Sequence, residues 1–318
     1  MKKIGIVITI LMSIGVLLAN KAFKNQMVTA KPNILFVAID DLRPTLSCYR
    51  DSIALTPNID ELASNGTIFT KAYCQQAVSN PSRLSILTGL RPDQNHAANL
   101  VNQFREKIPN LITLTQIFKV NGHGSLDLGK IHYGSKKARD HVSWSKPALL
   151  NVSNKAMEYT LAKNKSGNKA ASFESADVGD KVYEVGQIAN EAIRSLTQFQ
   201  KNGGPFFLAV GFKKPHLPFS APKKYWELYE PNLFSTISQR KKLTYTPDLA
   251  FHDSQELRGY VDIPNIGTIN SEKEKNLWQV YYACVRYIDA QLGKIMKLMR
   301  DLGLDKKYYC CIVGGSWI

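Results

Sequence analysis

The residues with the clearest capacity for chemistry lie between Ser79 and Arg83, in the sequence Ser-Asn-Pro-Ser-Arg. Pro81 suits the first turn of a helix, apolar residues follow it, and Gly89 can end the helix. Ser79 is therefore predicted at a helix N-terminus, where free N–H groups and the helix dipole favour an anion. Arg83, one turn later, can direct a guanidinium to the same place. The alternative is an ordinary capped helix with a surface arginine, because short motifs recur by chance.

Two adjacent carboxylates form a second candidate group. Asp40 and Asp41 follow the apolar run Ile34–Ile39, which is typical of a buried parallel strand. Open α/β sheets place their sites at the carboxyl ends of such strands. Neighbouring carboxylates repel each other unless a cation lies between them. The pair therefore indicates a metal site, with a solvated loop as the alternative.

Two lysine and histidine pairs also follow predicted strands. Lys130 and His132 lie two residues apart, so an extended backbone would project both side chains to the same side. Lys214 and His216 follow a longer apolar run, and prolines on both sides restrict the histidine. A histidine titrates near neutral pH. Each pair can therefore supply a positive charge and a proton donor, although an isolated Lys-x-His is usually a surface feature.

The apolar pattern alternates between strands and helices, which predicts an α/β fold with a mostly parallel central sheet flanked by helices. Strands are predicted at 34–39, 67–73, 124–128, 205–212 and 307–313, and helices at 56–66, 79–89, 111–120, 185–199 and 271–303. Residues 135–182 are polar and rich in lysine. They indicate an excursion from the core, either a substrate-side rim or a solvated loop.

The 318 residues suffice for one large domain or two ordinary ones. Residues 1–30 combine Lys2 and Lys3 with an apolar run, Ile4–Leu18, that is short for a membrane span. We expect a signal peptide or N-terminal anchor, and a periplasmic or secreted protein without a stable membrane span.

The net charge of +15 suits an anionic substrate, and no nucleic-acid motif is evident. The five cysteines have irregular spacings that fit neither a disulfide framework nor a metal site.

Taken together, these strings resemble the sulfatase family of the alkaline phosphatase superfamily. The resemblance lies in Ser-x-Pro-Ser-Arg with Leu-Thr-Gly-Leu-Arg-Pro, in Gly-Lys-x-His-x-Gly, and in Lys-Pro-His-x-Pro-Phe. The string Asn-Ile-Leu-Phe-Val-x-Ile-Asp-Asp-Leu-Arg-Pro and residues 256–264 resemble the iduronate-2-sulfatase-like branch. The resemblance extends over about residues 31–313.

The resemblance implies a sulfuric ester hydrolase that removes sulfate from a sulfated carbohydrate, as in glycosaminoglycan degradation. It implies that a serine-type maturase oxidises Ser79 to Cα-formylglycine. It also implies that Asp40, Asp41 and Ser79 bind Ca²⁺, or Mg²⁺, through oxygen ligands. The implied catalytic residues are Ser79, Arg83, Lys130, His132 and His216, and the implied substrate-binding residue is Lys214.

Two alternatives stay open: an unmodified Ser79 acting as the nucleophile of a phosphatase or phosphodiesterase, and an inactive fragment. In the family, the strand predicted at 307–313 leads into a Gly-Asp-His-Gly or Gly-Asp-Asn-Gly turn that carries further metal ligands. Here it leads into Gly314–Ile318, which has no such turn. We therefore expect residues 31–318 to be the N-terminal part of a sulfatase catalytic domain, without the end of the sheet and the C-terminal subdomain. Alone, this part is expected to bind Ca²⁺ weakly and to be nearly inactive.

Overall fold

The computed structural model describes residues 31–133, 140–149, 158–165, 170–236, 243–247 and 254–314. The predicted targeting segment, residues 1–30, lies outside the described residues. From Asn33 onward the chain forms one compact unit. Within the described part of the chain, no helix is both long enough and apolar enough to cross a membrane.

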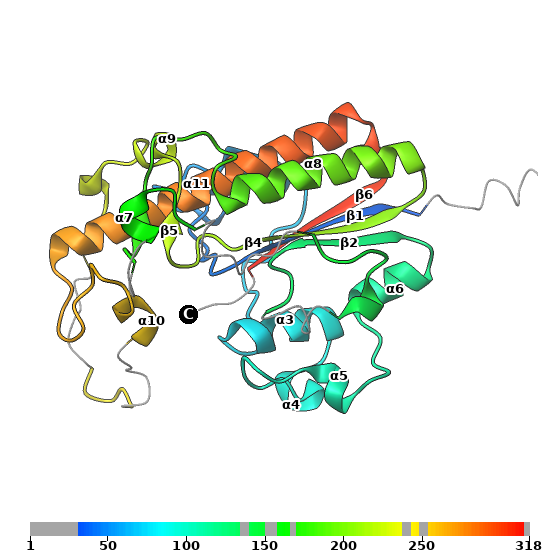
Figure 1. Cartoon of the computed structure of the whole chain (residues 1–318), viewed down its shortest axis with the longest axis horizontal. Helices are drawn as coiled ribbons and strands as arrows, with labels where there is room; N and C mark the ends of the chain where they lie inside the picture. The colour runs from blue at the N-terminus through cyan, green and yellow to red at the C-terminus, as the bar shows by residue number, and fades with distance from the viewer. Residues whose placement is uncertain are drawn as a thin grey trace, which may run out of the picture. The chain divides into compact units, whose positions relative to one another are not determined.

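A parallel sheet lies at the centre of the described residues (Figure 1). Its strand order is β2 (Gly124–Gly129), β4 (Phe206–Phe212), β1 (Asn33–Ile39) and β6 (Tyr308–Gly314). Every neighbouring pair runs parallel. The two central strands are buried almost throughout, as continuous apolar sequences predict for strands covered on both faces. The predicted α/β fold with a parallel central sheet is confirmed.

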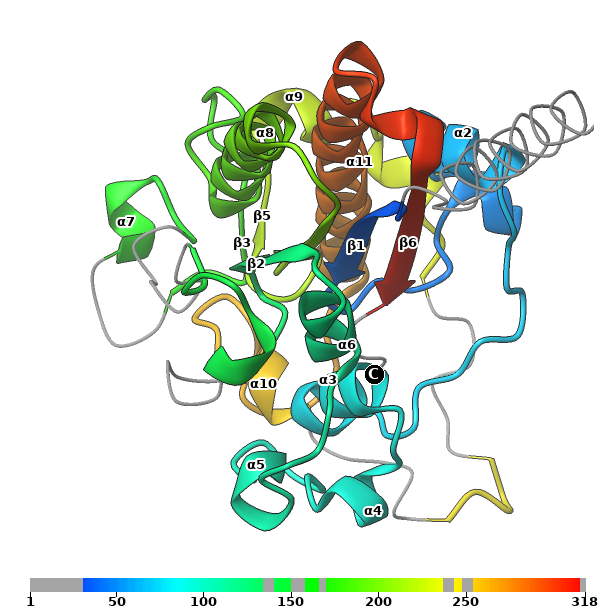
Figure 2. The same cartoon turned by 90° about the vertical axis from the view of Figure 1, so that its right-hand side faces the viewer.

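Helices cover both faces of this sheet (Figures 1 and 2). The long helices α8 (Glu184–Asn202) and α11 (Ser271–Asp301) lie on one face, and α3 (Ser79–Thr88) and α6 (Leu114–Val120) lie on the other. Alternate residues of each strand point to opposite faces. The core under α8 and α11 therefore takes Leu35, Val37 and Ile39 from β1, while the core on the α3 side takes Ile34, Phe36 and Ala38.

Shorter elements connect these layers. A second, two-stranded parallel sheet pairs β3 (Phe173–Glu174) with β5 (Phe219–Ser220), the strand that follows β4 along the chain (Figure 2). The remaining elements are η1 (Ser47–Tyr49), α2 (Pro57–Ser64), α4 (Pro92–Asn95), α5 (Phe104–Lys107), η3 (His141–Ser143), α7 (Ala162–Lys165), β3 (Phe173–Glu174), β5 (Phe219–Ser220), α9 (Lys223–Trp226), η5 (Pro231–Leu233), α10 (Gln255–Arg258) and η7 (Leu304–Lys307).

One predicted strand is wrong. Residues 67–73, all within the described part of the chain, form no strand. Phe69 and Tyr73 are 71% and 81% exposed, so the apolar side chains of this segment cover no core. β-propensity mainly measures how well a residue packs on a half-buried sheet, and this segment has no sheet to join.

The helix predicted at 111–120 begins only at Leu114, because the Thr113 hydroxyl caps it by accepting the Gln116 N–H at 3.1 Å.

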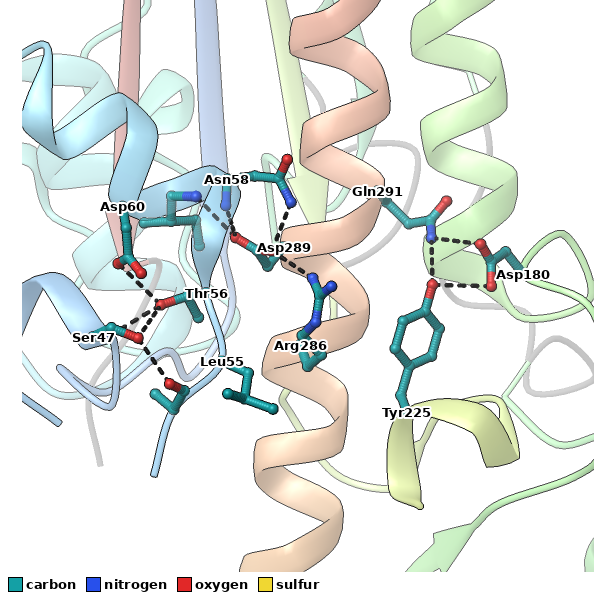
Figure 3. Close-up of polar contacts among 12 residues, drawn as sticks. Ser47, Leu55, Thr56, Asn58, Asp60, Asp180, Tyr225, Arg286, Asp289 and Gln291 are labelled. Atoms are coloured by element: carbon teal, nitrogen blue, oxygen red, sulfur yellow. Dashed lines mark hydrogen bonds and ion pairs between the residues drawn. The ribbon is translucent and has the colours of Figure 1, made fainter. Parts of the chain in front are cut away.

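The N-terminus of α2 is capped from a distant helix (Figure 3). Thr56 occupies the N-cap position, as its sequence suggested, but its hydroxyl donates to Asp60 Oδ1 at 3.1 Å instead of capping the helix. The carboxylate of Asp289 in α11 accepts the N–H groups of Asn58 and Ile59 at 3.0 and 2.8 Å. A buried carboxylate of α11 thus satisfies the free donors of α2 and fastens the two helices together.

A second carboxylate, Asp180, joins the segment before α8 to α9 and α11 (Figure 3). It accepts hydrogen bonds from Lys224 at 2.7 Å, Lys294 at 2.5 Å and Gln291 at 3.1 Å. Burial by itself would raise the pKa of Asp180, but these donors hold it well below its usual range.

The lowered pKa predicts how Asp180 contributes to stability at different pH values. A carboxyl whose pKa is depressed by folding stabilises the protein above its unfolded pKa of about 4, and this contribution is lost as the pH falls further. We expect Asp180→Asn to be less stable than the parent at pH ~7, with a smaller difference at pH ~2. Urea unfolding at both pH values measures this, and an unchanged difference would contradict the assignment.

Candidate active site

The predicted site residues gather where β1, β2 and β4 end. Asp40 follows β1, Lys130 follows β2, and His216 lies in the loop after β4. Backbone hydrogen bonds extend the sheet past the strand ends, since Asp40 N donates to Phe212 O at 3.0 Å and Lys130 N to Gly211 O at 2.8 Å. The sheet itself therefore positions the first two side chains, at the edge where open α/β folds place their sites.

Asp40 is the centre of this group. Its side chain is fully buried, and its Oδ1 accepts from Arg83 Nη2 at 2.5 Å while its Oδ2 is bound by the ammonium of Lys130. Burial by itself would raise the pKa of Asp40, but Arg83 and then Lys130 hold it well below its usual range. Asp40 is therefore ionised at neutral pH and binds the side chains of Arg83 and Lys130 at the end of β1.

Arg83 brings helix α3 to this centre. Its side chain is 2% exposed, and its Nη1 donates to the carbonyl oxygens of Lys130 at 2.5 Å and Ile131 at 3.3 Å. One guanidinium thus binds both the end of β1 and the segment after β2, which needs the planar set of donors that arginine has. Helix α3 begins at Ser79, and Arg83 lies one turn later. The residue that caps its C-terminal end is Gly89, with φ of 70°. The predicted helix start at Ser79 is confirmed.

Two glycines allow β2 and β4 to approach closely where Lys130 begins. Gly129 has φ of +74°, and a Cβ there would lie 2.2 Å from Gly211 O. A Cβ on Gly211 would lie 2.2 Å from the carbonyl carbon of Lys130. Any side chain at either position would push the strands apart. The glycine before Lys130 is therefore part of what directs the lysine to Asp40.

His216 presents one ring nitrogen to two carboxylates. Its Nδ1 is 2.6 Å from Leu217 O, and its Nε2 is 3.3 Å from Glu256 Oε1 and 3.9 Å from Asp41 Oδ2. Burial, together with Lys130, lowers the pKa of His216 to about 4. Asp41 has φ of 54°, which turns its carboxylate towards His216 while that of Asp40 faces Arg83.

His132 and Lys214 are both buried inside the protein. His132 is buried against Trp144, whose Nε1 donates to His132 Nε2 at 3.4 Å. Lys214 is 2% exposed, and its Nζ donates to the carbonyl oxygens of His216 at 3.2 Å and Pro218 at 2.5 Å. Lys214 therefore braces the His216 loop from inside the protein. The substrate contact predicted for Lys214 stays a prediction, as do the catalytic roles of the other residues.

Comparison with known proteins decides the family. A family model described as Sulfatase matches residues 32–315. The chain belongs to the sulfatase family. The iduronate 2-sulfatases of Mus musculus and Homo sapiens are 34% and 32% identical to it over 297 and 309 residues, which is 89% and 93% of this chain. These matches cover 54% and 56% of the two relatives, so this sulfatase chain spans about half of their length.

Solved structures share the fold of this sulfatase chain. The phosphonate monoester hydrolase of Agrobacterium radiobacter superposes with a TM-score of 0.69 and 18% sequence identity. The match covers 90% of this chain and 62% of the hydrolase. At this level of identity the likeness concerns the fold alone.

Asp40 and Asp41 are the type of ligand that Ca²⁺ binds, but two carboxylates are fewer ligands than the ion takes. Asp40 and Asp41 offer carboxylate oxygens, which Ca²⁺ prefers, but the ion takes ~6–8 oxygen ligands. Both oxygens of Asp40 are bound by cationic side chains. Across the described ranges, no group of three or more His, Cys, Asp or Glu side chains is placed to share a metal ion. The two carboxylates supply only part of the ligand set that Ca²⁺ takes.

Two acidic residues near this site have no recognisable signal in the sequence. Glu256 lies in α10 and contacts His216, although the stretch around it was assigned no role. Glu158 comes from the lysine-rich excursion and binds the ammonium of Lys213. Both residues lie in segments whose apolar residues show no regular spacing. Their contacts with Lys213 and His216 can therefore be seen only in the folded chain. Of the lysines in this excursion, Lys136, Lys137 and Lys169 lie outside the described residues.

Proposed function

We propose that this chain is the sulfate-binding part of a sulfuric ester hydrolase that acts on a sulfated carbohydrate. The observation that carries the proposal is the contact of Asp40 with Arg83 and Lys130, directly after the strand ends and on the helix that Ser79 begins. Membership of the sulfatase family and the likeness to iduronate 2-sulfatase support the same reaction class.

Each candidate residue has a proposed part in the reaction. Ser79, oxidised by a serine-type maturase to Cα-formylglycine, would supply the nucleophile at the start of α3. Arg83 and Lys130 would stabilise the negative charge that develops on the sulfate. His216 is the proposed donor of a proton to the leaving alcohol, with His132 as the second catalytic histidine. With a pKa of about 4, His216 is neutral at pH 7 and must gain a proton before it can donate one.

Three further parts of the proposal rest on the family and the sequence. Ca²⁺, or Mg²⁺, at Asp40 and Asp41 would require the contacts of Asp40 with Arg83 and Lys130 to open. Residues 1–30 are proposed as a signal peptide or N-terminal anchor. The protein would then act in the periplasm or outside the cell.

A hydrolysis assay tests the proposed function. The protein as its host produces it is given either a sulfated disaccharide that contains a uronate or a phosphate monoester. We expect sulfate release, and we expect Ser79→Ala to abolish it because the nucleophile is gone. Phosphate release without sulfate release would support a phosphatase or phosphodiesterase with unmodified Ser79. Failure to release either would support the inactive fragment.

A further inference from the structure

The loop after β4 carries two adjacent lysines, and the structure separates their roles. We propose that Lys213, and not Lys214, is the substrate-facing cation of this loop, and that it binds the sulfate group of the sulfate ester. The inference rests on the proposed function and adds a binding residue to it. It was not apparent from the sequence, where Lys214 was the predicted substrate contact.

The alternation of β4 places the two lysines on opposite faces of the sheet. Residues 206, 208, 210 and 212 pack into the core under α8 and α11, while residues 207 and 209 pack into the core on the α3 side. Continuing this alternation puts Lys213 on the α3 side and Lys214 on the opposite side. Because Ile39 is paired with Phe212, Lys213 follows β4 where Asp40 follows β1.

The electrostatic surroundings agree with this placement. The ammonium of Lys213 forms an ion pair with Glu158. Burial, with the neighbouring charges of Lys214 and Lys130, lowers the pKa of Lys213 to about 7, while Asp40 and Glu256 act in the opposite direction. Lys213 therefore lies within electrostatic reach of the groups that form the candidate site, as Lys214 also does, and the ion pair with Glu158 is what distinguishes Lys213.

Lys213 is also the most accessible cation near Asp40. The side chain of Arg83 is 2% exposed and that of Lys130 is 8% exposed, whereas that of Lys213 is 16% exposed. Arg83 and Lys130 are both paired with the fully buried Asp40, and Arg83 also donates to a backbone carbonyl group, whereas Lys213 is paired with Glu158, which is 10% exposed. Lys213 is thus more open to a ligand arriving from solvent than Arg83 or Lys130 is.

The ion pair with Glu158 positions the ammonium of Lys213. Its carboxylate is 10% exposed, and its backbone carbonyl accepts from Ser220 Oγ at 2.6 Å. The segment that carries Glu158 is therefore attached to β5, directly after the His216 loop. The lysine-rich excursion thus contributes to the substrate side of the site, which favours one of the two interpretations left open by its sequence.

Calorimetric titration of the 318-residue chain with inorganic sulfate tests the inference. We expect Lys213→Met to weaken sulfate binding at least ~10-fold, the effect of losing one charged contact, and to lower the Tm because Glu158 loses its partner. Lys213→Arg keeps the charge and is expected to bind within ~3-fold of the parent. Lys223→Met, which removes an exposed lysine of α9, is the matched control and should bind as the parent does. Lys214→Met should also lower the Tm, because it leaves two loop carbonyl groups without their donor, but it should bind sulfate within ~3-fold of the parent.

The outcomes separate this inference from the proposed function. If Lys213→Met binds sulfate as tightly as the parent while Arg83→Lys binds it more weakly, the inference is wrong and the proposed function stands. If the parent does not bind sulfate, or if Arg83→Lys and Lys213→Met both bind as the parent does, the proposed sulfate site is wrong and the inference falls with it.

Discussion

Replacing Arg83 by lysine is expected to reduce sulfatase activity at least ~10²-fold, the usual effect of removing a preorganised donor from a site where charge develops. The guanidinium of Arg83 reaches Asp40 and the carbonyl groups of Lys130 and Ile131 at the same time. A lysine ammonium keeps the charge but cannot span these acceptors. Initial rates of sulfate release measure the loss.

Arg91→Lys is the matched control for this experiment. Arg91 lies in the same family string, but its side chain is 65% exposed and pairs only loosely with Asp93 at 3.4 Å. We expect its replacement to leave the rate within ~2-fold, since exposed ion pairs contribute little. An unchanged rate in Arg83→Lys would refute the proposed role of Arg83.

Asp40→Asn is expected to have the largest effect on stability of any single polar substitution proposed for this site. The change removes the charge that two buried cations share, and breaking a buried ion pair from one side costs about 3–5 kcal/mol. Urea unfolding at neutral pH measures the free energy. The exposed carboxylate of Asp93 provides the control, because Asp93→Asn should cost less than ~0.5 kcal/mol. Equal stability of parent and Asp40→Asn would show that the carboxylate does not organise the site.

Much of the site could be predicted because its residues follow strong local signals. The continuous apolar sequences of β1 and β4 fix both strands, so the residues that follow them must reach the same edge of a parallel sheet. The start of α3 at Ser79 follows from Pro81 in its first turn, and its end follows from Gly89. These signals act over a few residues and do not depend on the rest of the fold.

Features that depend on pairing between distant segments could not be predicted. The sequence Lys213-Lys214 does not reveal that Lys213 pairs with Glu158 while Lys214 donates to carbonyl groups of its own loop, because these contacts depend on how distant segments fold around the loop. Capping of α2 by Asp289 joins residues that are far apart in the chain. The failed strand at 67–73 has the same cause, since a strand needs a neighbour that its own residues cannot specify.

The mass of the tryptic peptide Ala72–Arg83 tests the central claim most directly. The chain is produced with a serine-type sulfatase maturase, and the peptide is compared with that of a chain produced without it. With the maturase present, we expect the peptide to be lighter by the mass of two hydrogen atoms, with the change located at Ser79. A protein that releases sulfate while Ser79 keeps the mass of an unmodified serine would contradict it.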